Sequence, residues 1–373
     1  MATRPDRFLF LLSRVLGGKT FTGQLMHALE RVPGVRPHFV FLEEDDYGRH
    51  ADKIPAANRL SGTYVGPEIL RWKLRKEPPP PCDAVFVQSF ELLPACDDLD
   101  PGLPAVLAHD STNLLSYRLI RDQKPSWAAS AECWGKSLLT HSRYAQALRR
   151  VKAFLPRTRW CADSLVRDFG VDPSRIRVTP AGLDTAWWCP SPEPRKEEPP
   201  VLLFVGDDFE RKGGPFLVDL FARYIHPRAR LKIVSRHPGL KGRRMPPGVE
   251  VLSNYGPGRR LALLEEFRTA SIFVFPTRKE HMGLVLAEAA AAGLPLIATD
   301  VGGTSQVVRH GENGYLMPYD AGAGDWARAI LDFLADAPKR LRFGEAARTL
   351  AEREFSQEAL RDNVEWALET AAR

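Results

Sequence analysis

The sequence predicts an α/β protein with two parallel-sheet domains, and three observations support this. Short apolar runs alternate with longer helical patterns along the chain, which is typical of βαβ units. A proline-rich, almost wholly polar segment at residues 189–200 divides the alternation into two comparable halves. The chain has 373 residues, which suits two domains at roughly 150 residues each.

The expected strands are apolar throughout rather than alternating, which indicates burial on both faces of a sheet. They are Phe8–Leu12, Phe39–Leu42, Ala84–Gln88, Ala105–Ala108, Val201–Val205, Arg230–Val234, Ser271–Phe275 and Leu296–Ala298. Helical patterns lie between them, for example at Gly23–Arg31 and Glu288–Ala292. We therefore expect an N-terminal domain at 1–188, a linker at 189–200, a second domain at 201–355 and a C-terminal helix within 356–373. Two such sheets joined by a linker would place a substrate cleft between them.

Composition excludes several classes of protein. The 52 basic and 46 acidic residues give a net charge of +6, which is too mild for a nucleic-acid binder but suits a partner that carries phosphate.

No apolar run approaches the ~18 residues of a membrane-spanning helix. The basic start before Phe8 resembles a signal peptide, but its apolar run ends at Ser13, so we interpret it as a buried strand. The expected location is cytoplasmic.

The cysteines indicate neither a disulfide framework nor a thiolate zinc site. They are odd in number, widely spread and without a C-x-x-C pair. They are Cys82, Cys96, Cys133, Cys161 and Cys189. We expect reduced thiols.

Residues 271–318 carry the most information about function. A strand ends at Pro276, a loop carries Glu280, and a helix that is apolar on every side carries Glu288. A carboxylate in a buried helix costs several kcal/mol unless it is hydrogen-bonded, and the two hydroxyls of a ribose would satisfy it. In the alternative interpretation, Glu280 caps the helix and Glu288 pairs with a buried arginine.

The start of that helix is a candidate anion site. Its first N–H groups and the positive end of its dipole suit a diphosphate. The residues at this position are Met282, Gly283 and Leu284.

This segment resembles the E-x7-E motif of the retaining glycosyltransferase group 1 family, which has the GT-B fold. Glu280 and Glu288 match the two acids, and Pro276-Thr277, Gly302–Thr304 and Gly311–Gly314 match flanking positions. The resemblance implies two Rossmann-like domains facing each other across a cleft, with the last helix, near Gln357–Ala371, crossing back to the first domain. It also implies that Glu280 approaches the transferred sugar and that Glu288 binds the nucleotide ribose.

The resemblance covers most of the chain from about Ser164 to Tyr319, where Gly182 and Asp184 match a short hinge motif. Two positions depart from the family pattern. Met282 stands where an aromatic residue is usual, and Gln306 where an acid is frequent. These departures leave the donor preference open.

A charged loop follows the strand Val201–Val205. Lys212 matches the lysine that the family uses on the donor diphosphate, where negative charge grows as the glycosidic bond breaks. Some members have an arginine where Asp207 stands, and we expect Arg211 to compensate. The alternative is a solvated turn with a charged tip.

Gly17 and Gly18 follow the first strand and match a family glycine pair that lets the backbone approach the donor phosphates or the acceptor. Residues 13–20 (SRVLGGKT) also come close to a phosphate-binding P-loop. Ser13 replaces the first glycine of that motif, so a P-loop enzyme is the less favoured alternative.

His109 comes at the end of the strand Ala105–Ala108, where the family has a histidine that contacts the sugar. We therefore place His109 with Glu280 as a catalytic candidate. Asp98 and Asp100 have the D-x-D form of metal-dependent transferases, but they lie in a predicted loop. We expect no metal, since cationic side chains and a helix dipole can replace it.

Residues 133–162 contain basic residues and no acid. They form either a basic face that contacts anionic lipid or a phosphorylated acceptor, or a core helix with a solvated basic face. We favour the second interpretation.

The resemblance implies transfer of a sugar from a nucleoside-diphosphate sugar to the hydroxyl of a glycan or lipid-linked acceptor, with retention, and without metal or further cofactor. It suggests a role in polysaccharide synthesis, with peripheral contact at the inner membrane face as an option. The alternatives are another GT-B enzyme, an epimerase or a phosphorylase, and a non-catalytic partner subunit.

Overall fold

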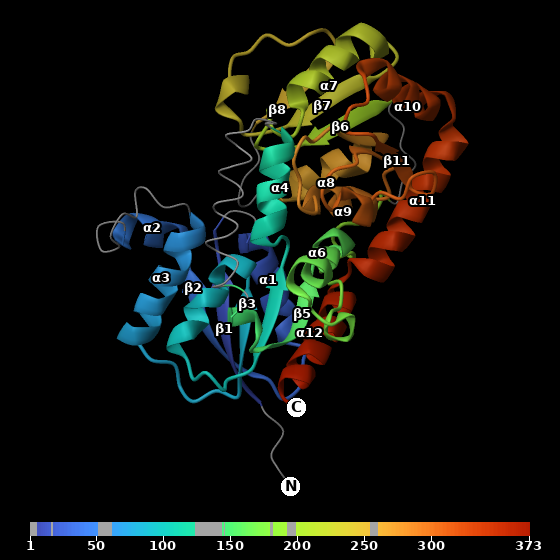
Figure 1. Ribbon diagram of the computed structural model, residues 1–373. Helices are drawn as coiled ribbons and strands as arrows, with labels where there is room; N and C mark the ends of the chain where they lie inside the picture. The colour runs from blue at the N-terminus through green and yellow to red at the C-terminus, as the bar shows by residue number, and fades with distance from the viewer. Residues whose placement is uncertain are drawn as a thin grey trace. The chain divides into compact units, whose positions relative to one another are not determined.

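The structure is a computed structural model, and it describes residues 6–15, 18–50, 62–123, 144, 146–179, 182–191, 199–253 and 260–373. The chain forms two compact α/β units (Figure 1). The first unit comprises Met1–Gly182 together with Gln357–Arg373, and the second comprises Leu183–Ser356.

The first unit contains a parallel sheet with the strand order β2-β1-β3-β4-β5. Its strands are β1 (Arg7–Ser13), β2 (Arg36–Leu42), β3 (Ala84–Gln88), β4 (Ala105–His109) and β5 (Val151–Pro156). Its helices are α1 (Gly18–Leu29), α2 (Glu44–His50), α3 (Gly62–Lys76), α4 (Asn113–Gln123), α6 (Arg159–Phe169) and α12 (Gln357–Ala371), with 3-10 turns η3 (Phe90–Asp98) and η4 (Pro173–Arg175).

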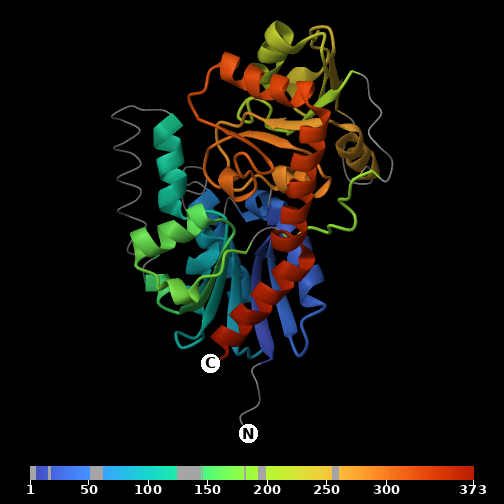
Figure 2. The ribbon, with the colours of Figure 1, turned by 90° about the vertical axis from the view of Figure 1, so that its right-hand side faces the viewer.

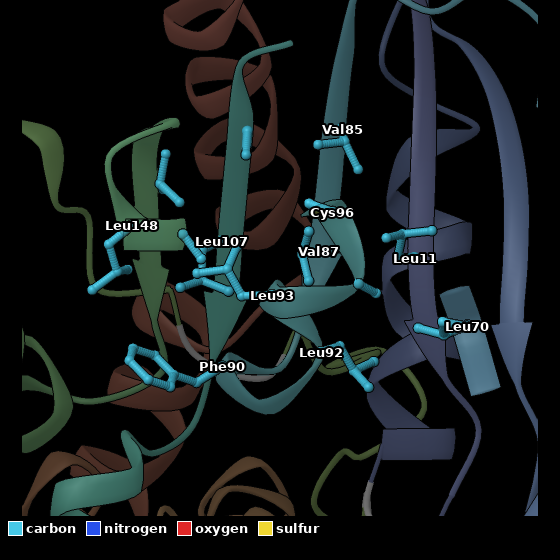
Figure 3. Close-up of a cluster of buried hydrophobic side chains, with 14 of the residues drawn as sticks. Leu11, Leu70, Val85, Val87, Phe90, Leu92, Leu93, Cys96, Leu107 and Leu148 are labelled. Carbon is cyan, nitrogen blue, oxygen red and sulfur yellow. The ribbon is translucent and has the colours of Figure 1, made fainter. Parts of the chain in front are cut away.

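Side chains alternate between the two faces of this sheet and build two cores. On one face, Phe10 and Phe86 pack with α1 and α12, and Figure 2 shows α12 in red along the strands. On the other face, Val87 and Leu107 pack with α3 and η3 (Figure 3). Helices on both faces explain why the strands are apolar throughout.

The second unit contains a six-stranded parallel sheet with the order β11-β10-β9-β6-β7-β8. Its strands are β6 (Val201–Val205), β7 (Arg230–Val234), β8 (Val249–Leu252), β9 (Ile272–Phe275), β10 (Leu296–Thr299) and β11 (Gly314–Met317). Its helices are α7 (Gly214–Leu220), η5 (Phe221–Ile225), α8 (Arg260–Thr269), α9 (Leu284–Ala291), α10 (Ala323–Ala335) and α11 (Ala337–Glu354), with 3-10 turns η6 (Pro238–Leu240) and η7 (Thr304–Gln306).

This strand order is the doubly wound Rossmann order, in which the chain starts in the middle of the sheet and builds outward in both directions. The direction reverses between β6 and its neighbour β9. In open parallel sheets, ligands bind beyond the carboxyl ends of the strands at this switch point. The loops after β6 and β9 therefore mark where a site is expected.

The boundary between the units comes earlier in the chain than the proline-rich segment. Leu183 already belongs to the second unit, because it bridges to Ser356 and its N–H donates to the carbonyl of Phe355. Gly182 belongs to the first unit, and its carbonyl accepts a hydrogen bond from the side chain of Gln357. Residues 192–198 of the expected linker lie outside the described part of the chain.

The helix interpretation of residues 133–162 is wrong for part of that segment. Residues 151–156 form β5, which pairs with β4, and only Lys152 of this strand is exposed. The flanking basic residues hid a short apolar run that the sheet buries. Residues 133–143 and 145 lie outside the described residues, so neither interpretation of their basic face is tested.

Candidate active site

Two loops meet at the switch point of the second sheet. Residues 206–213 follow β6 and residues 276–283 follow β9, and the N–H of Arg278 donates to the carbonyl of Arg211 at 2.9 Å. Gly213 adopts a left-handed φ of 79°, and a Cβ atom there would lie 1.9 Å from the carbonyl oxygen of Pro276. Only glycine permits this close approach, so the sequence brings the two loops into direct contact.

Lys212 crosses from the first loop toward the second. Its side chain passes over Gly206, where an added Cβ would lie 2.4 Å from the Lys212 Cδ atom. The Lys212 Nζ atom lies 5.3 Å from the centroid of the Phe275 ring at the end of β9. Within the described residues, no carboxylate forms an ion pair with Lys212. It is therefore a cation available to an anionic ligand.

Arg211 fastens the two loops together. Its Nε atom donates to Asp208 at 2.6 Å, and its Nη1 atom donates to the carbonyl of Lys279. The same Nη1 atom lies 3.8 Å from Glu280 Oε2. Arg211 therefore positions the loop that carries Glu280, and its charge is shared with acidic neighbours.

Glu280 lies in this loop, with its side chain 17% exposed. Its Oε1 atom accepts a hydrogen bond from the N–H of His281 at 3.2 Å. It does not cap α9, because Gly283 occupies that position. The carboxylate is thus held beside the helix start, where it can contact a ligand.

The N-terminus of α9 carries no side-chain cap. Gly283 has a left-handed φ of 79°, and Met282 before it is buried and anchors the loop. No group in the described ranges accepts a hydrogen bond from the N–H of Leu284 or Val285. Such N–H groups, with the helix dipole behind them, favour a bound anion.

Glu288 lies on the second turn of α9 and is partly buried. Burial raises the pKa of Glu288 to about 7, although the positive charges of Arg260 and Lys212 act to lower it. Neither cation forms an ion pair with it, and none of the residues described here donates a hydrogen bond to its carboxylate. The Glu288 carboxylate can therefore accept hydrogen bonds from the hydroxyl groups of a ligand.

The remaining predicted site residues belong to the first unit. Gly17 lies outside the described residues. Gly18 begins α1, and its carbonyl accepts a hydrogen bond from Gln88 Nε2 at 3.1 Å. Gln88 Oε1 also accepts from the Thr22 hydroxyl at 2.7 Å, so β1, α1 and β3 are tied at this sheet's own switch point.

His109 ends β4 and is only 2% exposed. Burial lowers the pKa of His109 to about 4, so the imidazole is neutral near pH 7. Neither ring nitrogen has a hydrogen-bond partner among the described residues, and the ring lies 5.7 Å from that of Phe90. The contact with a sugar therefore stays a prediction.

Sequence reasoning missed an ion pair between two strand ends. Asp207, which follows β6 closely, accepts hydrogen bonds from the backbone N–H and the guanidinium of Arg236, which follows β7. The Arg236 guanidinium lowers the pKa of Asp207. Their positions just beyond adjacent parallel strands were the only signal, since the two residues are far apart in the sequence.

The D-x-D segment, which includes Asp98, forms ion pairs with helix α3. Asp98 ends η3 and forms ion pairs with Arg71 at 2.8 Å and Arg75 at 2.7 Å. Within the described residues, no group of three or more His, Cys, Asp or Glu side chains is arranged to hold a metal ion.

Residues 190–350 match the family described as glycosyl transferases group 1. These residues form a group 1 glycosyltransferase domain. The match includes both loops of the switch point, so Lys212, Glu280 and Glu288 lie within the family domain.

Part of the chain is also similar to curated glycosyltransferases and to a related synthase. The D-inositol 3-phosphate glycosyltransferase of Pseudarthrobacter chlorophenolicus is 34% identical over 203 residues, which cover 50% of this chain and 48% of that protein. The alpha-maltose-1-phosphate synthase of Mycolicibacterium smegmatis is 29% identical over 221 residues, covering 52% and 57%. The chain thus spans about half the length of these relatives.

Solved structures extend the likeness to nearly the whole chain. Sucrose-phosphate synthase from Thermosynechococcus elongatus has a TM-score of 0.71 at 18% identity and covers 96% of this chain and 97% of its own. HepE of Anabaena, solved with UDP, has a TM-score of 0.67 at 14% identity and covers 96% and 98%. At this identity the likeness concerns the fold. The group 1 glycosyltransferase domain therefore belongs to a GT-B chain with two Rossmann-like parallel-sheet units.

Across the described parts of the chain, every helix is too short or too polar to span a membrane.

Proposed function

We propose that this protein transfers a sugar from a nucleoside-diphosphate sugar to an acceptor hydroxyl. One observation carries the proposal. Among the residues that the structure describes, a lysine without an ion pair, the uncapped start of a helix and a carboxylate without a hydrogen-bond donor lie together at the switch point of the second sheet. A nucleoside diphosphate carries groups that match them: its negative phosphates suit the lysine and the helix start, and the two hydroxyls of its ribose suit the carboxylate. The membership of residues 190–350 in the group 1 family supports this assignment.

The roles follow from the contacts. Lys212 and the N–H groups of Leu284 and Val285 stabilise the negative charge that develops on the leaving diphosphate. Glu288 accepts hydrogen bonds from the ribose hydroxyls. Glu280, fixed by Arg211, orients the transferred sugar.

These groups need no metal, because a cation and a helix dipole neutralise the diphosphate. We also propose retention of the anomeric configuration, in line with the E-x7-E resemblance. The acceptor proton passes to the leaving phosphate, and His109 contacts the sugar. Gly17 and Gly18 give the backbone room to approach the phosphates or the acceptor.

The acceptor is proposed as a class only. Relatives named for glycosylation of inositol phosphate and a structural neighbour involved in lipopolysaccharide biosynthesis favour a phosphorylated, glycan or lipid-linked hydroxyl compound. This fits a role in polysaccharide or glycoconjugate synthesis at the cytoplasmic side of a membrane.

The test is release of nucleoside diphosphate from UDP-glucose, GDP-mannose and ADP-glucose in the presence of EDTA. The proposal predicts release from one of these donors, and a loss of about a hundredfold or more in Glu280→Gln, the usual scale for removal of a transition-state contact. Release that depends on added divalent metal would contradict metal independence. Nucleotide binding without release or transfer would instead favour a non-catalytic partner subunit. Binding of free phosphate without any nucleotide preference would favour a phosphorylase.

A further inference from the structure

Two tryptophans stand in a tight turn at the start of the second unit. The Asp184 carboxylate accepts a hydrogen bond from the N–H of Trp187, and the Asp184 carbonyl accepts one from the N–H of Trp188, both at 2.9 Å. The Trp188 side chain is 2% exposed and packs edge-on against Phe267 of α8, with ring centroids 5.4 Å apart. The turn therefore holds both indoles on a fixed backbone.

Two arginines lock this turn onto the helices of the second unit. The Arg348 guanidinium on α11 donates to the carbonyl of Trp188 at 2.6 Å and to the carbonyl of Ala291, at the end of α9, at 2.7 Å. Arg268 on α8 donates to the carbonyl of Cys189 at 3.2 Å. A site supported in this way is preorganised and does not need to order on binding.

Arg260 links the turn to the proposed nucleotide site. It is the first residue of α8, and its guanidinium carbon lies 5.5 Å from the ring centroid of Trp187 and 5.8 Å from that of Trp188. Its positive charge also lowers the pKa of Glu288, with a larger effect than that of Lys212. The indole N–H of Trp187 is buried and has no hydrogen-bond partner among the residues described. A flat cation, an aromatic ring and a donor without a partner among the described residues thus lie together, and the charge of the cation acts on Glu288.

We infer that Arg260 and Trp187 form the binding site for the nucleobase of the donor. The inference rests on the proposed function, which places the diphosphate at Lys212 and the ribose at Glu288. The base is attached to C1′ of the ribose and the diphosphate to C5′, so the two groups extend from different carbons of the sugar whose hydroxyls Glu288 would bind. Guanidinium planes and aromatic rings stack on nucleobases, and the Trp187 N–H can donate to a carbonyl or a ring nitrogen of the base.

The test is isothermal titration of the full chain with UDP, GDP, ADP and CDP. Arg260→Ala should weaken binding of the tightest-binding nucleotide about tenfold, the usual scale for loss of one side chain that stacks on a base. It should also narrow the spread of affinities among the four bases. Trp187→Ala should narrow the same spread, and Arg260→Lys, which keeps the charge but not the plane, should resemble Arg260→Ala.

Two control variants separate a base contact from other effects. Lys212→Ala should weaken all four nucleotides by a similar factor, because it removes a phosphate contact. Arg342→Ala removes an exposed arginine whose guanidinium carbon lies 5.8 Å from the Phe343 ring on α11, and it should change no affinity. Melting temperatures establish that each variant is folded.

The outcomes distinguish the two proposals. A spread that narrows in both Arg260→Ala and Trp187→Ala supports the base site. Unchanged affinities and an unchanged spread in both variants would overturn it while leaving the proposed function standing. If the wild-type chain binds none of the four nucleotides, the proposed function fails and the base site fails with it.

Discussion

Replacement of Glu288 by glutamine should raise the unfolding free energy relative to that of the wild type as the pH rises. Burial raises the pKa of Glu288 from its ordinary value of 4.5 to about 7. The folded wild type thus binds a proton that the unfolded chain has released, and it loses stability as the pH rises from 4.5 through 7. At about 1.36 kcal/mol per pKa unit, the full loss is about 3 kcal/mol. Glutamine has no charge to bury, so the variant does not share this loss.

Urea unfolding between pH 5.5 and 8.5 measures this effect. The difference in unfolding free energy between Glu288→Gln and wild type should grow by about 2 kcal/mol over that range and level off above pH 7. Any pH-independent cost of the amide cancels in this comparison. Glu345→Gln, on the exposed surface of α11, should stay within about 0.5 kcal/mol of wild type throughout. A constant difference between Glu288→Gln and wild type from pH 5.5 to 8.5 would show that the pKa of Glu288 is not raised in the folded protein.

Three further substitutions test the geometry. Lys212→Ala should lower the rate of nucleotide release from the donor by about a hundredfold, and donor-release kinetics would show a much smaller change if the lysine only braces the loop. Gly213→Ala should lower the melting temperature by several degrees more than Gly242→Ala, because both positions have positive φ but only a Cβ at 213 meets Pro276. Arg348→Ala leaves the carbonyl groups of Trp188 and Ala291 without their hydrogen-bond donor and should cost about 3 kcal/mol of unfolding free energy. A cost below about 1 kcal/mol in a urea titration would show that Arg348 does not hold the turn onto α9 and α11.

The central strands could be predicted because both of their faces are buried. Val201–Val205 and Ala84–Gln88 were predicted with the bounds that the structure shows. The strands that sequence reasoning missed are β5, β8 and β11, which all lie at sheet edges. Strands β8 and β11 are only partly buried, so their apolar signal is weaker, whereas β5 is buried and was hidden by the basic residues that flank it. The four residues of β8, for example, include only partly buried and exposed positions.

Glu280, Glu288 and Lys212 could be predicted as site candidates because each stands in a local motif. The partners that shape the site could not, because they come together only when strands and helices are assembled. Arg236 reaches Asp207 from the next strand, and the charge of Arg260 acts on Glu288 from the preceding helix. The spacing of residues along the chain does not predict such contacts between distant segments.

The melting temperature of the protein with UDP, GDP, ADP and ATP, each with magnesium and with EDTA, tests whether the switch point of the second sheet binds a nucleoside diphosphate. We expect a rise with one nucleoside diphosphate that magnesium does not alter. At a hundredfold excess over Kd the stabilisation is about 2.7 kcal/mol, which corresponds to several degrees, and Glu288→Ala should abolish most of it. A rise only with ATP and magnesium would favour the P-loop alternative at residues 13–20, and no rise with any nucleotide would contradict the account.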